Sequence, residues 1–137
     1  MSAIVIDASA IIAILWNEPE KDRFVDGILA ASSRLMSAVS VQEAGMAIAG
    51  RFGDEAVWKS LDALLSLLDL EIVPHDADLA RIARQAFLRF GKGRHPAALN
   101  FGNCATYALA TNNNLPLVFK GDDFLKTDVV PAVSAPG

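Results

Sequence analysis

Carboxylate side chains stand at three places where the sequence changes from apolar to polar. Asp7 directly follows an apolar tripeptide, Glu43 lies in a segment rich in small apolar residues, and Asp122 and Asp123 follow a second apolar run. Carboxylates that converge repel one another unless a cation neutralises them. Oxygen donors without paired His or Cys favour Mg²⁺ or Mn²⁺ over Zn²⁺. These residues therefore indicate phosphodiester hydrolysis, in which such an ion activates water and stabilises the leaving oxygen.

Each acid also has a purely structural interpretation. Asp7 is a good N-cap for a following helix, and Asp122 and Asp123 suit the start of a short helix. Glu43 stands three residues after Ser40, the spacing of a capping box. Only the convergence of the acids at one place distinguishes a catalytic site from three ordinary helix ends.

Short apolar strands alternate with helical segments, and this pattern predicts an α/β fold. The predicted strands are Ala3–Ile6, Arg34–Ser37, Glu71–Val73 and Leu117–Phe119, with a fifth candidate at Val129–Val130. The predicted helices cover residues 9–16, 19–31, 40–50, 54–68 and 76–90, with a last helix that starts at Asn100 or Asn103 and runs through Ala110. We expect a three-layer α/β/α sandwich on a mainly parallel sheet of four to five strands. Right-handed crossovers would bring Asp7 and the residues after Phe119 to the same sheet edge.

Length and composition indicate one globular domain over residues 1–137. The chain is 53% hydrophobic with a mean hydropathy of +0.33, which is enough apolar surface for a core and excludes disorder. Its apolar runs are too short to span a membrane, and the N-terminus lacks the basic start of a signal peptide. The single cysteine, Cys104, excludes an internal disulfide. We therefore expect a soluble, cytoplasmic protein.

Charge is distributed unevenly along the chain. The net charge is −4, yet residues 79–121 carry six Lys and Arg side chains and no acid. Arg94, between glycine-containing turns, and Lys120, beside the acidic pair, are candidates to contact RNA phosphates. The alternative is that this basic segment pairs with the acidic first half inside the same fold.

Four motifs together resemble the PIN-domain ribonucleases, and among them the VapC toxins of bacterial toxin–antitoxin pairs. The motifs are Val5–Ala10, Ser40–Glu43, Leu99–Cys104 and Phe119–Phe124, which span almost the whole chain in the family's order. The resemblance implies Mg²⁺- or Mn²⁺-dependent endonucleolytic cleavage of RNA. It also implies a homodimer and a VapB-type antitoxin whose C-terminal segment lies along the toxin, with a basic side chain that reaches the carboxylates.

The resemblance assigns roles to individual residues. Asp7 matches the family's first metal-binding carboxylate and Glu43 the second, while Ser9 matches a hydroxyl residue that supports the first acid. Asp122 is the choice for the fourth acidic position, with the adjacent Asp123 as the alternative. The number of bound ions, one or two, stays open.

Asn103 departs from the family pattern, which places the third metal carboxylate there. An amide oxygen can bind a metal, but an amide carries no charge and cannot act as a general base. The chain is therefore an inactivated form, engineered or natural, or an enzyme with a weakened site. The alternative function is a non-catalytic module that binds antitoxin or RNA. A receiver-like signalling domain is a poorer match, because no Asp follows the second predicted strand.

Overall fold

A four-stranded parallel sheet organises the molecule. The computed structural model describes residues 2–133, and the sheet has the order β3-β2-β1-β4. The strands are β1 (Ala3–Ile6), β2 (Ser33–Ser37), β3 (Glu71–Val73) and β4 (Leu117–Val118). Ile4 is in register with Arg34 of β2, and Ile6 with Val118 of β4. All pairings are parallel, so the carboxyl ends of the strands share one edge.

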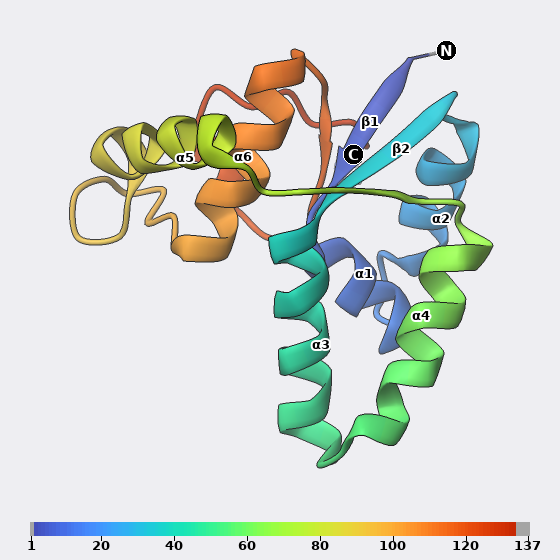
Figure 1. Ribbon diagram of the computed structural model, residues 1–137. Coiled ribbons are helices and arrows are strands. Elements are labelled where there is room, and N and C mark those ends of the chain that lie inside the picture. The colour runs from blue at the N-terminus through green and yellow to red at the C-terminus, as the bar shows by residue number, and fades with distance from the viewer. Residues whose placement is uncertain (1, 134–137) are drawn as a thin grey trace.

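Helices cover both faces of this sheet, as Figure 1 shows. One face carries α5 (Ala77–Phe90) and α6 (Phe101–Asn113), and the other carries α1 (Ala8–Leu15), α2 (Lys21–Ala30), α3 (Ala38–Phe52) and α4 (Trp58–Leu67). Along β1, Ile4 and Ile6 belong to the core under α1–α4, whereas Val5 belongs to the core under α5 and α6. This alternation follows from the two-residue period of a strand. The predicted three-layer sandwich is confirmed.

The helices α3 and α4 form a pair that projects beyond the sheet (Figure 1). A short 3₁₀ helix, Glu55–Val57, connects them, and the indole N–H of Trp58 donates to the backbone carbonyl of Gly45 at 2.8 Å. This bond ties the start of α4 to the middle of α3. A second 3₁₀ helix, Phe124–Lys126, follows β4.

Several predicted boundaries are wrong. The helix that contains Glu43 starts at Ala38 with Ser37 as its N-cap, so Ser40 and Glu43 do not form a capping box. Pro19 lies before α2, which starts at Lys21, and the segment after Asp54 begins as 3₁₀ rather than α-helix. In place of a fifth strand, an isolated bridge joins Pro131 to Leu117.

Part of the basic segment is paired inside the fold. The Lys120 ammonium lies 2.6 Å from Glu18 Oε2 and 3.0 Å from Glu20 Oε2, and Arg89 lies 3.2 Å from Asp128. The pairing of Lys120 with the acidic first half confirms the structural alternative for that residue. None of the helices that the structure describes is long and apolar enough to cross a membrane.

Candidate functional site

Asp7 sits at the carboxyl end of β1 and is 2% exposed. It is the N-cap of α1, because its Oδ2 accepts a hydrogen bond from the backbone N–H of Ser9 at 3.0 Å. Its Oδ1 accepts from the hydroxyl of Thr106 at 2.7 Å. The structural and the functional interpretations of Asp7 are therefore compatible: the cap fixes a buried carboxylate at the ligand-binding edge of the sheet.

Glu43 reaches the same region from α3. Its half-buried carboxylate packs against the backbone of Gly102, the second residue of α6. A Cβ at position 102 would lie 2.7 Å from Glu43 Oε1 and closer still to Oε2, so only glycine leaves room for the acid. Burial, and then the negative charge of Asp7, raise the pKa of Glu43.

These two acids form a donor set suited to a hard cation. None of the ion pairs among the described residues involves Asp7 or Glu43. Burial and the neighbouring Asp7 disfavour the ionised form of Glu43, a divalent ion would offset that cost, and carboxylate oxygens are the ligands Mg²⁺ and Mn²⁺ prefer. Within residues 2–133 no three His, Cys, Asp or Glu side chains gather as a metal site. The third oxygen donor must therefore come from a residue of another type, or from a carboxylate that moves.

Asn103, near the start of α6, is the residue that the family pattern offers as this donor, and its oxygen already accepts one hydrogen bond. In a capping box at the start of α6, Asn103 Oδ1 accepts from the Asn100 N–H at 3.1 Å, and Asn100 Oδ1 accepts from the Asn103 N–H at 2.9 Å. An amide oxygen has two lone pairs, so Oδ1 keeps one that can face a cation, whereas the NH₂ group is a donor and cannot bind one. The capping box predicted for Ser40 and Glu43 is absent, and a different one forms between Asn100 and Asn103.

The loop after β4 is attached to the site through Ser9. The backbone N–H of Lys120 donates to the Ser9 hydroxyl at 3.0 Å, whereas the contact from Ser9 to Asp7 uses the backbone N–H. Asp122 is exposed and lines a cavity of about 620 Å³ together with Arg23 and Glu20. Asp123 is exposed, and its side chain makes no capping bond to the 3₁₀ helix that follows. The structure brings neither acid into a three-carboxylate cluster with Asp7 and Glu43.

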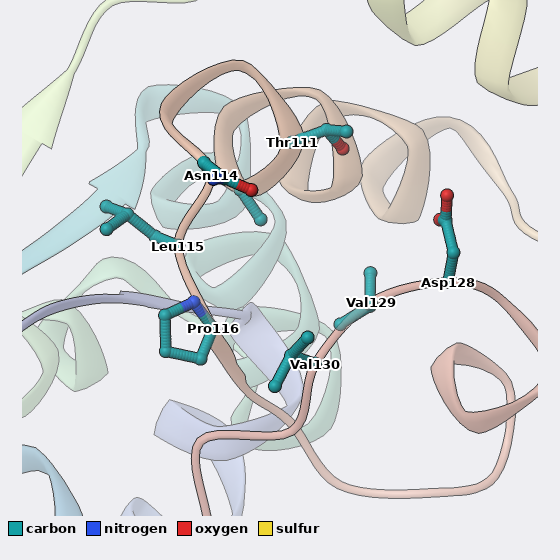
Figure 2. Close-up of a pocket in the computed structure, with 8 residues that line it drawn as sticks. Thr111, Asn114, Leu115, Pro116, Asp128, Val129 and Val130 are labelled. Atoms are coloured by element: carbon teal, nitrogen blue, oxygen red, sulfur yellow. The ribbon is translucent and has the colours of Figure 1, made fainter.

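A groove of about 440 Å³ opens beside Glu43. Its walls come from α3 and the start of α6, and they include Met46, which is 64% exposed, and Phe101, which is 78% exposed. A further cavity, drawn in Figure 2, lies between the end of α6 and the segment from Asp128 to Val130. Because that cavity contains Pro116, which precedes β4, it lies at the opposite edge of the sheet from Asp7.

Sequence reasoning missed two residues of the site. Thr106 is fully buried and contacts Asp7 directly, and Gly102 makes room for Glu43. The signal for Thr106 was a hydroxyl in an otherwise apolar helical segment, three residues after Asn103. Gly102, a glycine within the first turn of a helix, was a comparable signal because glycine is unfavourable there without a packing reason.

Replacing Glu43 by Gln is expected to raise the thermal stability of the metal-free protein at neutral pH. Folding raises the pKa of Glu43, so between the unfolded and the folded pKa the folded protein still binds a proton on Glu43 that the unfolded chain has released. The free energy of unfolding therefore falls as pH rises from about 4.3, the ordinary pKa of Glu, through the pKa of Glu43 in the folded protein. Thermal unfolding in EDTA checks this. Glu43→Gln should be more stable than the parent at neutral pH and lose that advantage in acid. Exposed Glu55→Gln is the control, and a Glu43→Gln chain no more stable than the parent at neutral pH would contradict the expectation.

Comparisons with known proteins agree with this geometry. The family model described as PIN domain matches residues 4–130. Ribonuclease VapC30 of Mycobacterium tuberculosis is 43% identical over 126 residues, which are 92% of this chain and 95% of that protein. Two solved structures share the fold: VapC20 of M. tuberculosis, described as a sarcin-ricin loop cleaving toxin, and a toxin–antitoxin complex from Klebsiella pneumoniae. Their TM-scores are 0.69 and 0.70, at 17% and 15% identity, and they cover 93% and 96% of this chain and 99% of each matched chain. The extent of the family match and the identity to VapC30 show that the chain belongs to the PIN-domain family.

Proposed function

We propose that this chain is the toxin of a type II toxin–antitoxin pair and an endoribonuclease that uses Mg²⁺ or Mn²⁺. The observation that carries the proposal is the convergence of buried Asp7 and half-buried Glu43 at the carboxyl edge of the sheet without a cationic partner among the described residues. Relatives as similar as 43% are named VapC ribonucleases, which supports RNA as the substrate.

Asp7, Glu43, Asn103 and Asp122 are the proposed ligands of the cation. When bound, the cation would lower the pKa of a water molecule and stabilise charge on the leaving oxygen. The chain's own part is to fix the carboxylates and to hold them partly away from solvent, where their charges act more strongly. Cys104 is not a candidate nucleophile, because its thiol is buried and burial raises its pKa.

Exchange of Asp122 and of Asp123 for Asn should separate the two candidates for the fourth acid. Asp122 lines a cavity with Arg23 and Glu20, and Asp123 starts the 3₁₀ helix. If Asp122 is the ligand, Asp122→Asn lowers cleavage by about tenfold or more in an active Asn103→Asp background, and Asp123→Asn changes it less than about threefold. Cleavage rates at saturating Mn²⁺ check this, with thermal unfolding as the folding control. The reverse order of effects would assign Asp123.

Arg94 and Lys120 should differ in their effect on RNA affinity. The Arg94 guanidinium is exposed and, among residues 2–133, bonds only the Leu88 carbonyl, whereas Glu18 and Glu20 neutralise Lys120. We expect Arg94→Met to weaken binding of a non-cleavable RNA a few-fold and to lower its salt dependence by about one unit of slope. Lys120→Met should leave the RNA affinity and its salt dependence nearly unchanged. Titrations at several salt concentrations check the pair, and a larger effect at Lys120 would restore that residue as the phosphate contact.

The proposed protein partners are a VapB-type antitoxin and a second copy of the chain. The groove beside Glu43 offers the exposed apolar side chains of Met46 and Phe101 next to a carboxylate, which suits an antitoxin segment with an apolar and a basic side chain. The Klebsiella structure that shares this fold is titled a toxin–antitoxin complex, which supports such a partner. Light scattering of the purified chain tests the homodimer.

Binding of Mn²⁺ tests the proposed metal site directly. We expect Mn²⁺ to raise the melting temperature of the parent chain, because a ligand that binds only the folded state stabilises it. Asp7→Asn should abolish that rise while the protein stays folded, since an Asn at position 7 can still cap α1. An equal rise in the parent and in Asp7→Asn would place the metal elsewhere and contradict the proposal.

The second candidate function is a non-catalytic module that binds antitoxin or RNA. Asn103 favours it, because an amide carries no negative charge and its one oxygen already accepts the Asn100 N–H. Under this alternative, restoring a carboxylate at position 103 gives no cleavage of RNA even though Mn²⁺ binds.

A further inference from the structure

Three buried side chains form a continuous hydrogen-bond chain beneath the site. The Ser40 hydroxyl lies 2.9 Å from the Thr106 hydroxyl, which donates to Asp7 Oδ1 at 2.7 Å. Ser40 and Thr106 are fully buried, and Asp7 is 2% exposed. Buried hydroxyls of this kind are costly to leave unpaired, so the chain is held together by the surrounding core.

The donors and acceptors in this hydrogen-bond chain follow from the chemistry of a hydroxyl group. A hydroxyl has one proton, and Thr106 gives its proton to Asp7. In the bond between Ser40 and Thr106, the donor must therefore be Ser40. Both bonds point toward the carboxylate, which strengthens the bond that Asp7 receives.

This hydrogen-bond chain joins the three elements that carry Asp7, Glu43 and Asn103, three of the four proposed ligands. Ser40 and Glu43 are three residues apart on α3, and Asn103 and Thr106 are three residues apart on α6, so each hydroxyl lies on the same side of its helix as the ligand. Asp7 joins β1 to α1. The hydrogen-bond chain thus fixes α3, α6 and the end of β1 relative to one another. Its two hydroxyls lie one helical turn from Glu43 and Asn103.

We propose that Thr106 is a positioning residue that sets the orientation of Asp7 and its separation from the ligands on α3 and α6, with Ser40 as its anchor. This inference rests on the proposed function. The two oxygens of Asp7 are held from different elements, by the Ser9 N–H and by the Thr106 hydroxyl, so the plane of the carboxylate is fixed before a cation binds. Without the Thr106 bond, Asp7 Oδ1 loses its hydrogen-bond donor and the carboxylate can rotate. Partners that orient a metal ligand in this way typically change metal affinity by about 10- to 100-fold when removed.

The test compares Mn²⁺ affinities, measured by calorimetry, of the parent and of three variants. Thr106→Val keeps the volume and removes the hydroxyl, and we expect it to weaken Mn²⁺ binding by about tenfold or more. Thr106→Ser keeps the hydroxyl and loses a methyl group, so it should be less stable but bind Mn²⁺ within about threefold of the parent. The matched control is Thr111→Val on the same helix, whose hydroxyl bonds the Tyr107 carbonyl and which should leave affinity unchanged.

Ser40→Ala keeps the test decisive if Thr106→Val does not fold. It removes the anchor while Thr106 still bonds Asp7, and we expect a smaller loss of Mn²⁺ affinity, about threefold to tenfold. Unchanged affinity in every folded variant that lacks one of these hydroxyls would overturn the positioning role and leave the proposed function standing. Failure of both the parent and Asn103→Asp to bind Mn²⁺ would overturn the proposed metal site, and this inference with it.

Discussion

Replacing Asn103 by Asp is expected to raise metal-dependent RNA cleavage by about 100-fold or more, equivalent to about 3 kcal/mol of transition-state stabilisation. The physical reason is the capping box. One oxygen at position 103 accepts the Asn100 N–H, so the second polar atom of the side chain decides whether a further oxygen can bind the cation. In Asn103 it is an NH₂ group, and in Asp it is an oxygen that shares a negative charge. The cap is preserved in both, so the fold should not change.

Cleavage of a mixed RNA pool in Mn²⁺ or Mg²⁺, compared with EDTA, measures this effect. The matched control is Asn100→Asp, which adds the same charge at the N-cap of α6, where Asp is also a good cap. Asn100→Asp should cleave no faster than the parent. Equal gains from Asp at positions 100 and 103 would mean that added charge, rather than a ligand at a particular place, is responsible.

Replacing Gly102 by Ala in the Asn103→Asp background should lower cleavage by about 100-fold, because a displacement of about 1 Å at a reacting group has effects of this size. A Cβ at position 102 would overlap the carboxylate of Glu43, which is the end of a flexible side chain and can rotate away. The methyl group should therefore move Glu43 out of the site rather than unfold the protein. Alanine within a helix should even offset part of the packing cost.

Gly50→Ala is the matched control for this glycine. Gly50 also lies in a helix, α3, but a Cβ there would meet no atom within 4 Å. We expect Gly50→Ala to keep full cleavage activity and to gain about 0.5–1 kcal/mol of stability. Thermal unfolding and cleavage rates of both variants check the pair. Full activity in Gly102→Ala would show that Glu43 has no role at its observed position.

The fold was largely predictable because its strands are short, apolar and regularly spaced. Four predicted strands lie where they were expected, and Asp7 follows β1 at the edge that parallel topology requires. The candidate fifth strand at Val129–Val130 did not form, because this segment pairs with Leu117 only through an isolated bridge at Pro131. Two β-branched residues indicate extended backbone, but a strand needs a partner along its whole length.

The site was less predictable, because its contacts join residues that are distant in the sequence. The Ser40–Glu43 spacing fits a capping box, yet Ser37 begins the helix, and Ser40 turns inward to bond Thr106. A motif of four residues cannot show which of two neighbouring serines starts a helix. The ion pairs of Lys120 with Glu18 and Glu20 depend on where a surface loop closes, which local patterns do not encode.

The most direct test of the proposed site compares RNA cleavage by three chains in Mn²⁺: the parent, Asn103→Asp, and Asn103→Asp combined with Asp7→Asn. We expect strong cleavage by Asn103→Asp alone, weak or no cleavage by the parent, and none by the double variant. Cleavage that survives the loss of Asp7 would contradict the assignment of the site. Absence of cleavage by Asn103→Asp, on a broad RNA pool and with Mn²⁺ bound, would contradict the endoribonuclease proposal and favour the binding module.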